Sequence, residues 1–497
     1  MTHKPHRRLA LALLCLLGIA VIAPSIRRAS AVPALAPLFP EAAAPNDRGA
    51  AGLGQAIRRL GVVASVLHTG AHPDDESSDL LAYLARGRQA RTAYLALTRG
   101  DGGQNLVGPE LYELLGVIRT DELLAARRID GASQFFTRAF DFGFSKSRDE
   151  TLSKWDREAV LSDMVRVIRT FRPLVIASQF GGTSSDGHGH HQAAGFLTPE
   201  AYRAAADPSR FPEQIAEGLR PWKAKKLYVG ARDRGQGERD PAPPQGTLLT
   251  INTGQFDPLL GRSYYEVAME GRSQHRSQDQ GALQRRGPQY RRLRLIEGPT
   301  SGVAQEKDIF DGIDISLMGI AEYAGTESGD LKRGLSEVQK AADEAKENYG
   351  PFSTSNLRPI IARGLKRIRN LRSSLAGMGL KGEARYEVDF LLTEKERDFE
   401  AALAKAGGVV VDCLSEDEIV TPGQTFNLSV FAYADGDSKD FAVSLSAPPG
   451  WSAVEKKRSS SVTDGRLAAQ ADFQVTVAPD AGFTQPYWLL NARNKDV

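Results

Sequence analysis

Cysteine is nearly absent from this chain of 497 residues. Its two cysteines are Cys15 and Cys413, and Cys15 lies in an N-terminal stretch with the features of a leader. Once such a leader is removed, one cysteine remains, which excludes an internal disulfide and a cysteine-based zinc site. Any bound metal must therefore be held by histidine and carboxylate side chains.

The chain also lacks an excess of charge of one sign. Its formal net charge is +2, but residues 1–31 hold five basic residues and no acidic one, so residues 32–497 carry −3. This balance gives no support for nucleic-acid binding. The hydrophobic content of 41% and the charged content of 25% are ordinary for a folded soluble protein, and the length suggests about three domains.

Residues 1–31 have the pattern of a secretory signal peptide. Basic residues precede the apolar run Leu9–Ala23, and the small residues Ala29–Ala31 form a cleavage site. We therefore expect an exported protein, periplasmic or extracellular. The uncharged span after Arg8 also leaves open a retained N-terminal membrane anchor. Residues 32–55, rich in alanine and proline, predict a linker.

Residues 56–306 predict an α/β domain with a Rossmann-like parallel sheet. Short apolar runs typical of buried strands alternate with amphipathic helical patterns, an order that indicates a sheet covered by helices on both faces. The strands are expected at Gly61–His68, Thr92–Thr98, Pro173–Phe180 and Lys226–Gly230, and helices at Ser78–Arg88, Gly116–Gly131 and 155–171. The last part, residues 236–306, is rich in Gly, Pro, Gln and Arg and predicts long loops around the sheet.

Two further regions follow the α/β domain. Residues 307–406 predict helices, because apolar residues such as Leu331, Leu335 and Val338 keep a spacing of three to four. Residues 407–497 change to an alternating pattern with Pro-Gly turns, which indicates a C-terminal β-sandwich. The chain stops soon after Trp488 with no obvious closing element, so we expect a truncated module.

The histidines are concentrated in two short segments. Six of the eight lie outside residues 1–31, and five of these six are His68, His72, His188, His190 and His191. Each segment follows a predicted strand of the sheet. Because loops after parallel strands meet at the carboxyl edge, where ligands bind, we expect the two segments to form one site.

The two segments together predict a mononuclear metal site. His72 and Asp75 are three residues apart across a turn that contains Pro73, and His191 opens the helix after the second segment. Two histidines and one aspartate with an open position are typical of catalytic zinc, and ferrous iron suits the same donors. Taken singly, His72 is more often explained as a hydrogen-bonded loop residue, and Asp75 as a helix N-cap.

Neighbouring residues predict the acid-base chemistry. Asp74 is next to a ligand but free to take a proton from zinc-bound water, so we expect it to act as the general base. His188 lies one turn before His191 and is expected to stabilise an oxyanion or to protonate a leaving amine. Glu76 is expected to interact with the following helix N-terminus, and His190 to stay outside the ligand set.

The motif Ala71–Glu76, together with His188-x-x-His191, resembles the zinc-dependent deacetylases of the PIG-L/LmbE type. Members of that family remove the acetyl group from N-acetylglucosamine attached to a lipid, inositol or a similar aglycone. The resemblance covers residues 60–235 and extends through the glycine-rich loop Thr98–Gly103 and through Leu115–Glu122.

The resemblance implies a role for each matching residue. The implied zinc ligands are His72, Asp75 and His191, the base is Asp74, the oxyanion residue is His188, and the substrate-binding residues are Arg119 and Asp101. One position departs from the pattern, because many members carry Asp where this chain has His190. Asp186 is a candidate to replace it in orienting a neighbouring imidazole.

We therefore expect an exported, metal-dependent amidohydrolase that removes acetyl from an N-acetylated amino sugar conjugate. Its substrate would be a glycolipid, an inositol conjugate or an envelope glycan, and the substrate or an uncleaved leader would bring it near a membrane. Tyr264, Tyr265, Arg272 and His275 form either part of a sugar-binding wall or part of the core.

Two other functions remain as alternatives. Gly187–His190 mimics the Gly-His-x-His ending of dinuclear metallophosphoesterases, although the Asn-His pair of that class is absent from the sequence. A non-catalytic glycan-binding envelope protein is the second alternative.

Overall fold

The computed structural model describes residues 47–231, 248–299, 306–325, 329–351, 354, 356–436 and 442–484. They form two compact units, one of which contains the α/β sheet and continues to Phe399, while the other contains Thr354–Arg358 and the chain from Glu400. The predicted leader and most of the predicted linker lie outside the described residues. Among the described helices, none has the length and apolarity needed to cross a membrane.

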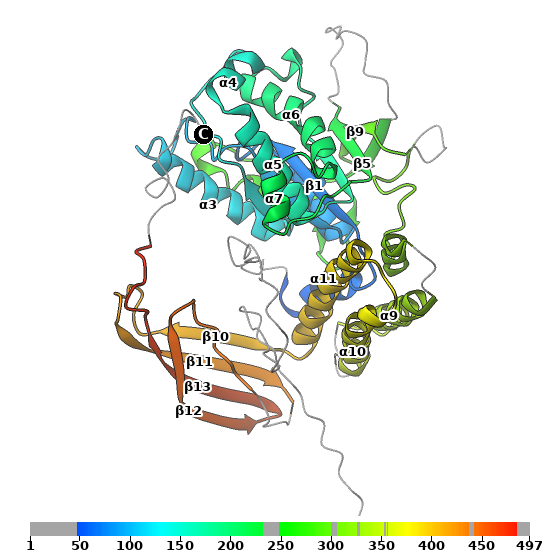
Figure 1. The fold of residues 1–497 in the computed structure, drawn as a ribbon, viewed down its shortest axis with the longest axis vertical. Coiled ribbons are helices and arrows are strands. Elements are labelled where there is room, and N and C mark those ends of the chain that lie inside the picture. The colour runs from blue at the N-terminus through cyan, green and yellow to red at the C-terminus, as the bar shows by residue number, and fades with distance from the viewer. Residues whose placement is uncertain are drawn as a thin grey trace, which may run out of the picture. The chain divides into compact units, whose positions relative to one another are not determined.

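A seven-stranded sheet forms the centre of the first unit (Figure 1). The order is β3-β2-β1-β4-β5-β9-β6, and the first five of these strands are parallel, whereas β9 is antiparallel to both neighbours. The strands are β1 (Ser65–Gly70), β2 (Arg91–Ala96), β3 (Ser133–Phe136), β4 (Val175–Ser178), β5 (Lys226–Gly230), β6 (Leu248–Asn252) and β9 (Tyr290–Glu297). The predicted Rossmann-like sheet is confirmed.

Two groups of helices pack around this sheet. One group contains α2 (Ser78–Ala82), its π-helical continuation η2 (Tyr83–Gly87), α3 (Glu113–Asp130) and α8 (Tyr264–Arg272). The other contains α4 (Arg148–Lys154), α5 (Arg157–Phe171) and α6 (Gly189–Ala206), with the short α7 (Pro212–Ala216) following in the chain. Strands β1 and β4 are buried along their whole length, as parallel strands between helical layers must be.

The strand order reverses between β1 and β4, and the chain leaves the carboxyl ends of these two strands in different directions. This is the switch point at which open α/β sheets bind ligands. Close packing keeps α6 near the loop after β4, since a Cβ at Gly195 would lie 2.2 Å from the backbone nitrogen of Gly182. Both predicted histidine segments emerge at this point.

Two sequence predictions for this unit are wrong in part. The end of the predicted linker is helical, because α1 (Gly49–Arg59) buries Leu53 and Ile57. The region 236–306 was expected to form loops, yet its described part contains β6, α8 and β9, besides the short β7 (Phe256–Asp257) and β8 (Arg262–Ser263). Ser263 and Glu266 form a capping box that starts α8, and Leu293 and Leu295 bury one side of β9.

The predicted helical region contains η5 (Leu317–Ala324), α9 (Gly329–Glu347), α10 (Leu357–Ser374), η6 (Leu375–Gly377) and α11 (Gly382–Ala406). Leu331, Leu335 and Val338 form the buried side of α9, as their spacing predicts. The helical residues up to Phe399, apart from Thr354–Arg358, belong to the same compact unit as the sheet, so they do not form a domain of their own.

The second unit contains a four-stranded antiparallel sheet of order β10-β11-β13-β12. Its strands are β10 (Val410–Ser415), β11 (Thr425–Asp435), β12 (Ser452–Thr463) and β13 (Arg466–Thr476). One face buries Phe426, Val430 and Phe473 beneath Val443 and Trp451. The predicted C-terminal β region is confirmed, but a second sheet facing the first is not among residues 407–436 and 442–484.

Candidate active site

His72, Asp75 and His191 come together at the carboxyl edge of the sheet. One ligand atom from each lies within 4.8 Å of the others. His72 Nδ1 is 3.0 Å from one oxygen of Asp75, and His191 Nε2 is 3.3 Å from the other oxygen. The first two residues belong to the turn after β1, and His191 lies in the first turn of α6. The grouping predicted from the sequence is therefore present.

The turn after β1 holds the Asp75 carboxylate in an ionised state. Its Oδ2 accepts hydrogen bonds from the backbone N–H groups of Ala71 (3.1 Å) and His72 (2.7 Å). Burial alone would raise the pKa of Asp75, but the neighbouring His72 and His191 outweigh it and hold the pKa well below the usual range. Asp75 is not the helix cap of α2, which is Ser77.

A backbone carbonyl orients His191. Its Nδ1 donates to the carbonyl oxygen of Asp186 at 3.2 Å, and its ring stacks on Phe180 at 4.2 Å. Because Nδ1 carries this proton, Nε2 is the free nitrogen on the side of Asp75. Asp186 thus orients an imidazole, as expected, but through its backbone carbonyl, because its carboxylate accepts from Gly181 and Thr183.

This donor set fits a divalent transition metal. Two imidazoles, each with one nitrogen available, and one ionised carboxylate match the protein ligands of catalytic zinc and of mononuclear ferrous iron. The residues that would hold the ion are His72, Asp75 and His191.

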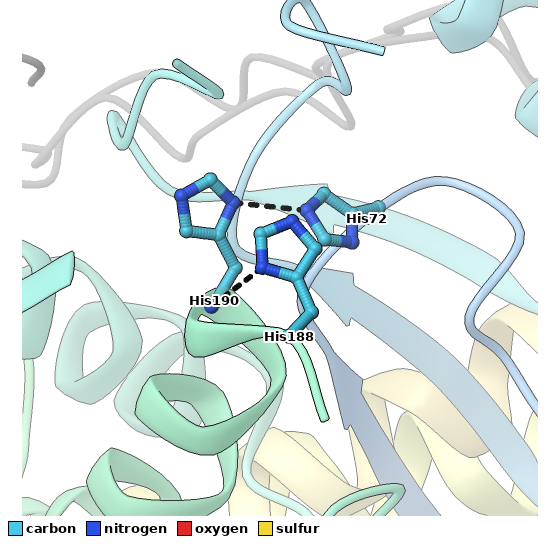
Figure 2. Close-up of side chains that lie close together, drawn as sticks. All are labelled: His72, His188 and His190. Atoms are coloured by element: carbon cyan, nitrogen blue, oxygen red, sulfur yellow. Dashed lines mark hydrogen bonds between the residues drawn. The ribbon is translucent and has the colours of Figure 1, made fainter. Parts of the chain in front are cut away.

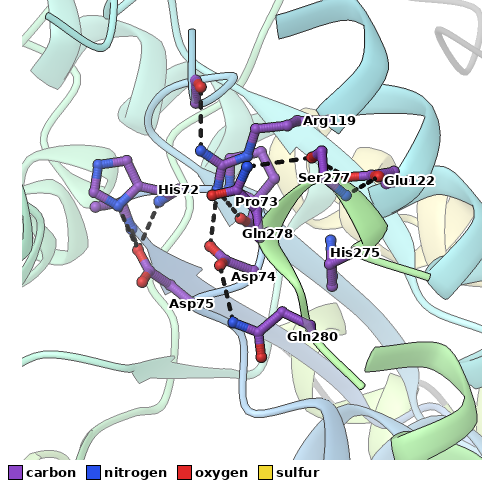
Figure 3. Close-up of polar contacts among 12 residues, drawn as sticks. His72, Pro73, Asp74, Asp75, Arg119, Glu122, His275, Ser277, Gln278 and Gln280 are labelled. Atoms are coloured by element: carbon purple, nitrogen blue, oxygen red, sulfur yellow. Dashed lines mark hydrogen bonds and ion pairs between the residues drawn. The ribbon is translucent and has the colours of Figure 1, made fainter. Parts of the chain in front are cut away.

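Asp74 lies beside this cluster with its carboxylate on the other side of the turn (Figure 3). Arg119 Nη2 lies 2.9 Å from one carboxylate oxygen, and Gln280 Nε2 lies 3.5 Å from the other. The backbone has a φ of 100°, which is unfavourable for aspartate, and Arg272 donates to its carbonyl oxygen at 3.0 Å. Burial raises the pKa of Asp74, partly offset by the charge of Arg119.

The two predicted substrate-binding residues are buried. Arg119 is 3% exposed and donates to the carbonyl oxygens of Gly100 (3.1 Å) and Pro73 (2.5 Å), so it joins the glycine-rich loop to the turn after β1. A Cβ at Gly100 would lie 2.4 Å from this guanidinium, which explains the glycine. Asp101 is equally buried, and burial raises its pKa to about 6. Their contacts with substrate stay predictions.

Glu76 has a structural role, but its main partners are not the helix N-terminus that the sequence suggested. Its carboxylate accepts from His275 Nε2 (2.9 Å), from Arg127 (3.2 Å) and from the backbone of Asp74 (3.0 Å). Burial opposes ionisation, but His275 and Arg127 outweigh it and lower the pKa of Glu76. His275 is fully buried, so it belongs to the core and not to a sugar-binding wall.

Tyr264 belongs to the core as well. It is buried beside Val267, and its hydroxyl lies 3.0 Å from the Asp257 carboxylate. Of the four residues considered for a sugar-binding wall, Arg272 and His275 contact the motif, at the Asp74 carbonyl oxygen and at the Glu76 carboxylate.

A second histidine group adjoins the first and shares His72. His72, His188 and His190 each place one nitrogen within 4.8 Å of the others (Figure 2). His188 is the N-cap of α6, and its Nδ1 accepts from the backbone N–H of His190 at 3.2 Å. Burial, with the charge of His72, lowers the pKa of His188 to about 4. The ring is therefore neutral at pH 7, with its proton on Nε2.

Comparison with known proteins identifies similar sequences for this part of the chain. The model of the family PIG-L, GlcNAc-PI de-N-acetylase, matches residues 67–202. A 1D-myo-inositol 2-acetamido-2-deoxy-alpha-D-glucopyranoside deacetylase of Thermobispora bispora is 30% identical over 187 residues, which are 34% of this chain and 59% of that protein. The second deacetylase of this name in Saccharopolyspora erythraea is 31% identical over 175 residues, 32% of this chain and 62% of that protein.

These matches span about 60% of the length of the two relatives. A solved structure, the N,N'-diacetylchitobiose deacetylase from Pyrococcus horikoshii, is 19% identical, with a TM-score of 0.32 over 43% of this chain and 70% of that one.

The region matched by the family model contains the whole of the site built above from His72, Asp74, Asp75, His188 and His191. It also contains most of β1 and the whole of β2, β3 and β4, which position these residues. Residues 67–202 of this chain are therefore similar to the PIG-L family of GlcNAc-PI de-N-acetylases, and this similarity covers the candidate site.

Proposed function

We propose that this protein is a metal-dependent deacetylase of an N-acetylglucosamine-type sugar conjugate. The observation that carries the proposal is the metal-ligand group of His72, Asp75 and His191 with the separate carboxylate of Asp74 beside it. The relatives support the substrate class, since their names describe removal of acetyl from an amino sugar on inositol.

The donor set supports zinc, with ferrous iron as the second candidate. When bound, the metal supplies a Lewis acid that polarises the amide carbonyl and makes water more acidic. The protein contributes the fixed geometry. Asp75 is held by two backbone N–H groups and His191 by a backbone carbonyl, so both ligands are oriented before the metal arrives.

Asp74 acts as the general base in this proposal. Its carboxylate accepts a proton from the water whose oxygen attacks the acetyl carbon, and the proton then passes to the amine nitrogen as the C–N bond breaks. The products are acetate and the free amino sugar. Arg119 and Gln280 hold the carboxylate from one side, which fixes its direction toward the reacting water.

His188 stabilises the oxyanion as a neutral hydrogen-bond donor. The accepting contact at Nδ1 leaves Nε2–H available, and a neutral donor suits a group whose pKa lies well below 7. Of the two roles expected for His188, the proposal therefore takes oxyanion stabilisation. Protonation of the leaving amine by a charged His188 is not needed.

We further propose that the protein works outside the cytoplasm, on a glycolipid, inositol conjugate or envelope glycan. The support is the signal-peptide pattern of residues 1–31. Mass spectrometry of the protein purified from its native host tests this. A mature N-terminus near Val32 is expected, and an intact Met1 in a cytoplasmic fraction would contradict it.

Acetate release tests the activity directly. Purified protein loaded with zinc or iron is incubated with N-acetylglucosaminyl-inositol, with N,N'-diacetylchitobiose and with an N-acetylglucosaminyl lipid. We expect acetate and a free amine in equal amounts from at least one substrate, and a strongly reduced rate with Asp74→Asn. Hydrolysis of a phosphodiester by a protein with two metals would favour the phosphoesterase, and tight sugar binding without acetate would favour the glycan-binding protein.

A further inference from the structure

A buried carboxylate lies behind His72, on the side away from Asp75. Asp141, in the loop between β3 and α4, is 3% exposed. Its Oδ2 is 3.7 Å from His72 Nε2, and its Oδ1 is 3.6 Å from His190 Nδ1. Asp141 was not among the residues predicted from the sequence, because no motif marks it. The segment Gly187–His191 itself has no carboxylate, so Asp141 comes from elsewhere in the chain.

The two nitrogens of His72 face different partners. Nδ1 lies 3.0 Å from the Asp75 carboxylate, and Nε2 lies toward Asp141 and 3.0 Å from His190 Nδ1. A histidine that ligates a metal must offer a lone pair on one nitrogen and carry a proton on the other. If Nδ1 gives its lone pair to a metal, the proton lies on Nε2, where His190 Nδ1 and the Asp141 carboxylate are the acceptors that face it.

The surroundings of Asp141 keep it in place. Its Oδ1 accepts from the backbone N–H of Gly143 at 2.9 Å, which commits this oxygen to its own loop and leaves Oδ2 for His72. Trp155 Nε1 donates to the carbonyl oxygen of Phe140 at 2.9 Å and so ties the end of α4 to the same loop.

His190 fills the space between this loop and His72. Its side chain is fully buried, stacked on Trp155 at 4.7 Å and against Phe142 at 4.5 Å. The ring therefore has no room to turn, and it limits movement of the His72 ring through the contact at Nε2 (Figure 2).

We propose that Asp141 is a positioning residue that fixes the tautomer and orientation of His72, with His190 as the packing wedge behind the same ring. The inference rests on the proposed function only in that His72 ligates a metal. It says nothing of the substrate, so its test uses metal affinity and not turnover.

The test is the zinc affinity of the full chain carrying Asp141→Asn, measured by competition with a chromogenic chelator. Asparagine can keep an oxygen toward Gly143 N–H while it replaces the oxygen facing His72 by an N–H donor. We expect zinc binding to weaken about 10- to 100-fold, as for other groups that orient a ligating histidine. The cobalt-substituted variant should also show a changed visible spectrum.

Two controls separate positioning from general destabilisation. Asp163→Asn removes a carboxylate that pairs with the exposed Arg138 and contacts no histidine among the described residues, so it should leave zinc affinity unchanged. His190→Asn leaves Asp141 intact but removes the imidazole that packs against His72, and should weaken zinc binding by a smaller factor. If Asp141→Asn fails to fold, the zinc affinity of His190→Asn still tests the proposal.

Wild-type zinc affinity in both Asp141→Asn and His190→Asn would overturn the proposal. So would two zinc ions per wild-type chain, one of them lost in His190→Asn, because the second histidine group would then be a metal site itself. Weakened zinc binding in Asp141→Asn, with no acetate released by the wild type, would contradict the proposed function and leave this inference standing.

Discussion

The guanidinium of Arg119 lies 2.9 Å from the carboxylate of Asp74, and the same side chain donates to the carbonyl oxygens of Pro73 and Gly100. One buried cation thus joins the glycine-rich loop after β2 to the turn that carries the proposed base. This network compensates for the unfavourable φ of Asp74 and fixes where its carboxylate lies.

Arg119→Lys should lower kcat about 10- to 100-fold with metal content unchanged. Lysine keeps the charge, but its compact ammonium cannot reproduce the planar set of three contacts that holds Asp74. Steady-state kinetics with the best substrate measure this, with Arg138→Lys, at an exposed ion pair with Asp163, as the matched control. A raised KM at wild-type kcat would show instead that Arg119 binds the substrate.

Asp74→Asn should reduce turnover by about 10²- to 10⁴-fold, the usual contribution of a general base. The amide has nearly the same shape, and Asp74 is not among the metal ligands, so zinc content should stay at the wild-type value. The test measures acetate release and zinc content on the same preparation of Asp74→Asn and compares both with wild type. Full activity in Asp74→Asn would rule out this residue as the base.

His68 should make the fold less stable in mild acid. Burial lowers its pKa to about 4, so the unfolded chain, with a histidine pKa near 6.5, binds this proton more readily than the folded protein does. Stability is therefore lost as the pH falls from 6.5 toward 4, by about 2 kcal/mol between pH 7 and pH 5. Urea unfolding at both pH values should show a smaller loss in His68→Gln; an equal loss would contradict the assignment.

Asp101 should make the fold less stable as the pH rises, which is the opposite of the effect of His68. Burial raises its pKa to about 6, so the folded protein binds this proton more tightly than the unfolded chain, and the contribution to stability falls as the pH rises. The expected decrease is about 1 kcal/mol between pH 5 and pH 8. The free energy of unfolding of Asp101→Asn, minus that of wild type, should therefore be larger at pH 8 than at pH 5. A pH-independent difference would show that Asp101 is ionised throughout.

The sequence predicts the centre of this fold because local patterns determine it. The apolar runs of β1 and β4 define buried strands, and the two histidine segments follow them directly, so one site at the switch point could be expected. By contrast, α8 and β9 lie in a Gly- and Arg-rich stretch whose composition suggests loops. Their structure comes from a cap at Ser263 and from pairing with distant strands.

The partners of the site residues are harder to predict than the ligands. Asp141, Gln280 and Arg127 reach the site from separate segments, and none of them belongs to a motif. The contact of the buried Arg119 with Asp74 was likewise not predicted from the motif. Motif spacing identifies residues that share a turn or a helix end, whereas contacts between distant loops depend on tertiary packing.

The most direct test of the central claim is the metal content of purified residues 32–497, compared with His72→Ala and His191→Ala. Metal stoichiometry does not depend on choosing the right substrate. We predict about one zinc or iron per wild-type chain and its loss in both variants, since each removes one of three protein ligands. Wild-type metal content in either variant, or no metal in the wild type under loading conditions that fill other zinc enzymes, would contradict a catalytic metal site at His72, Asp75 and His191.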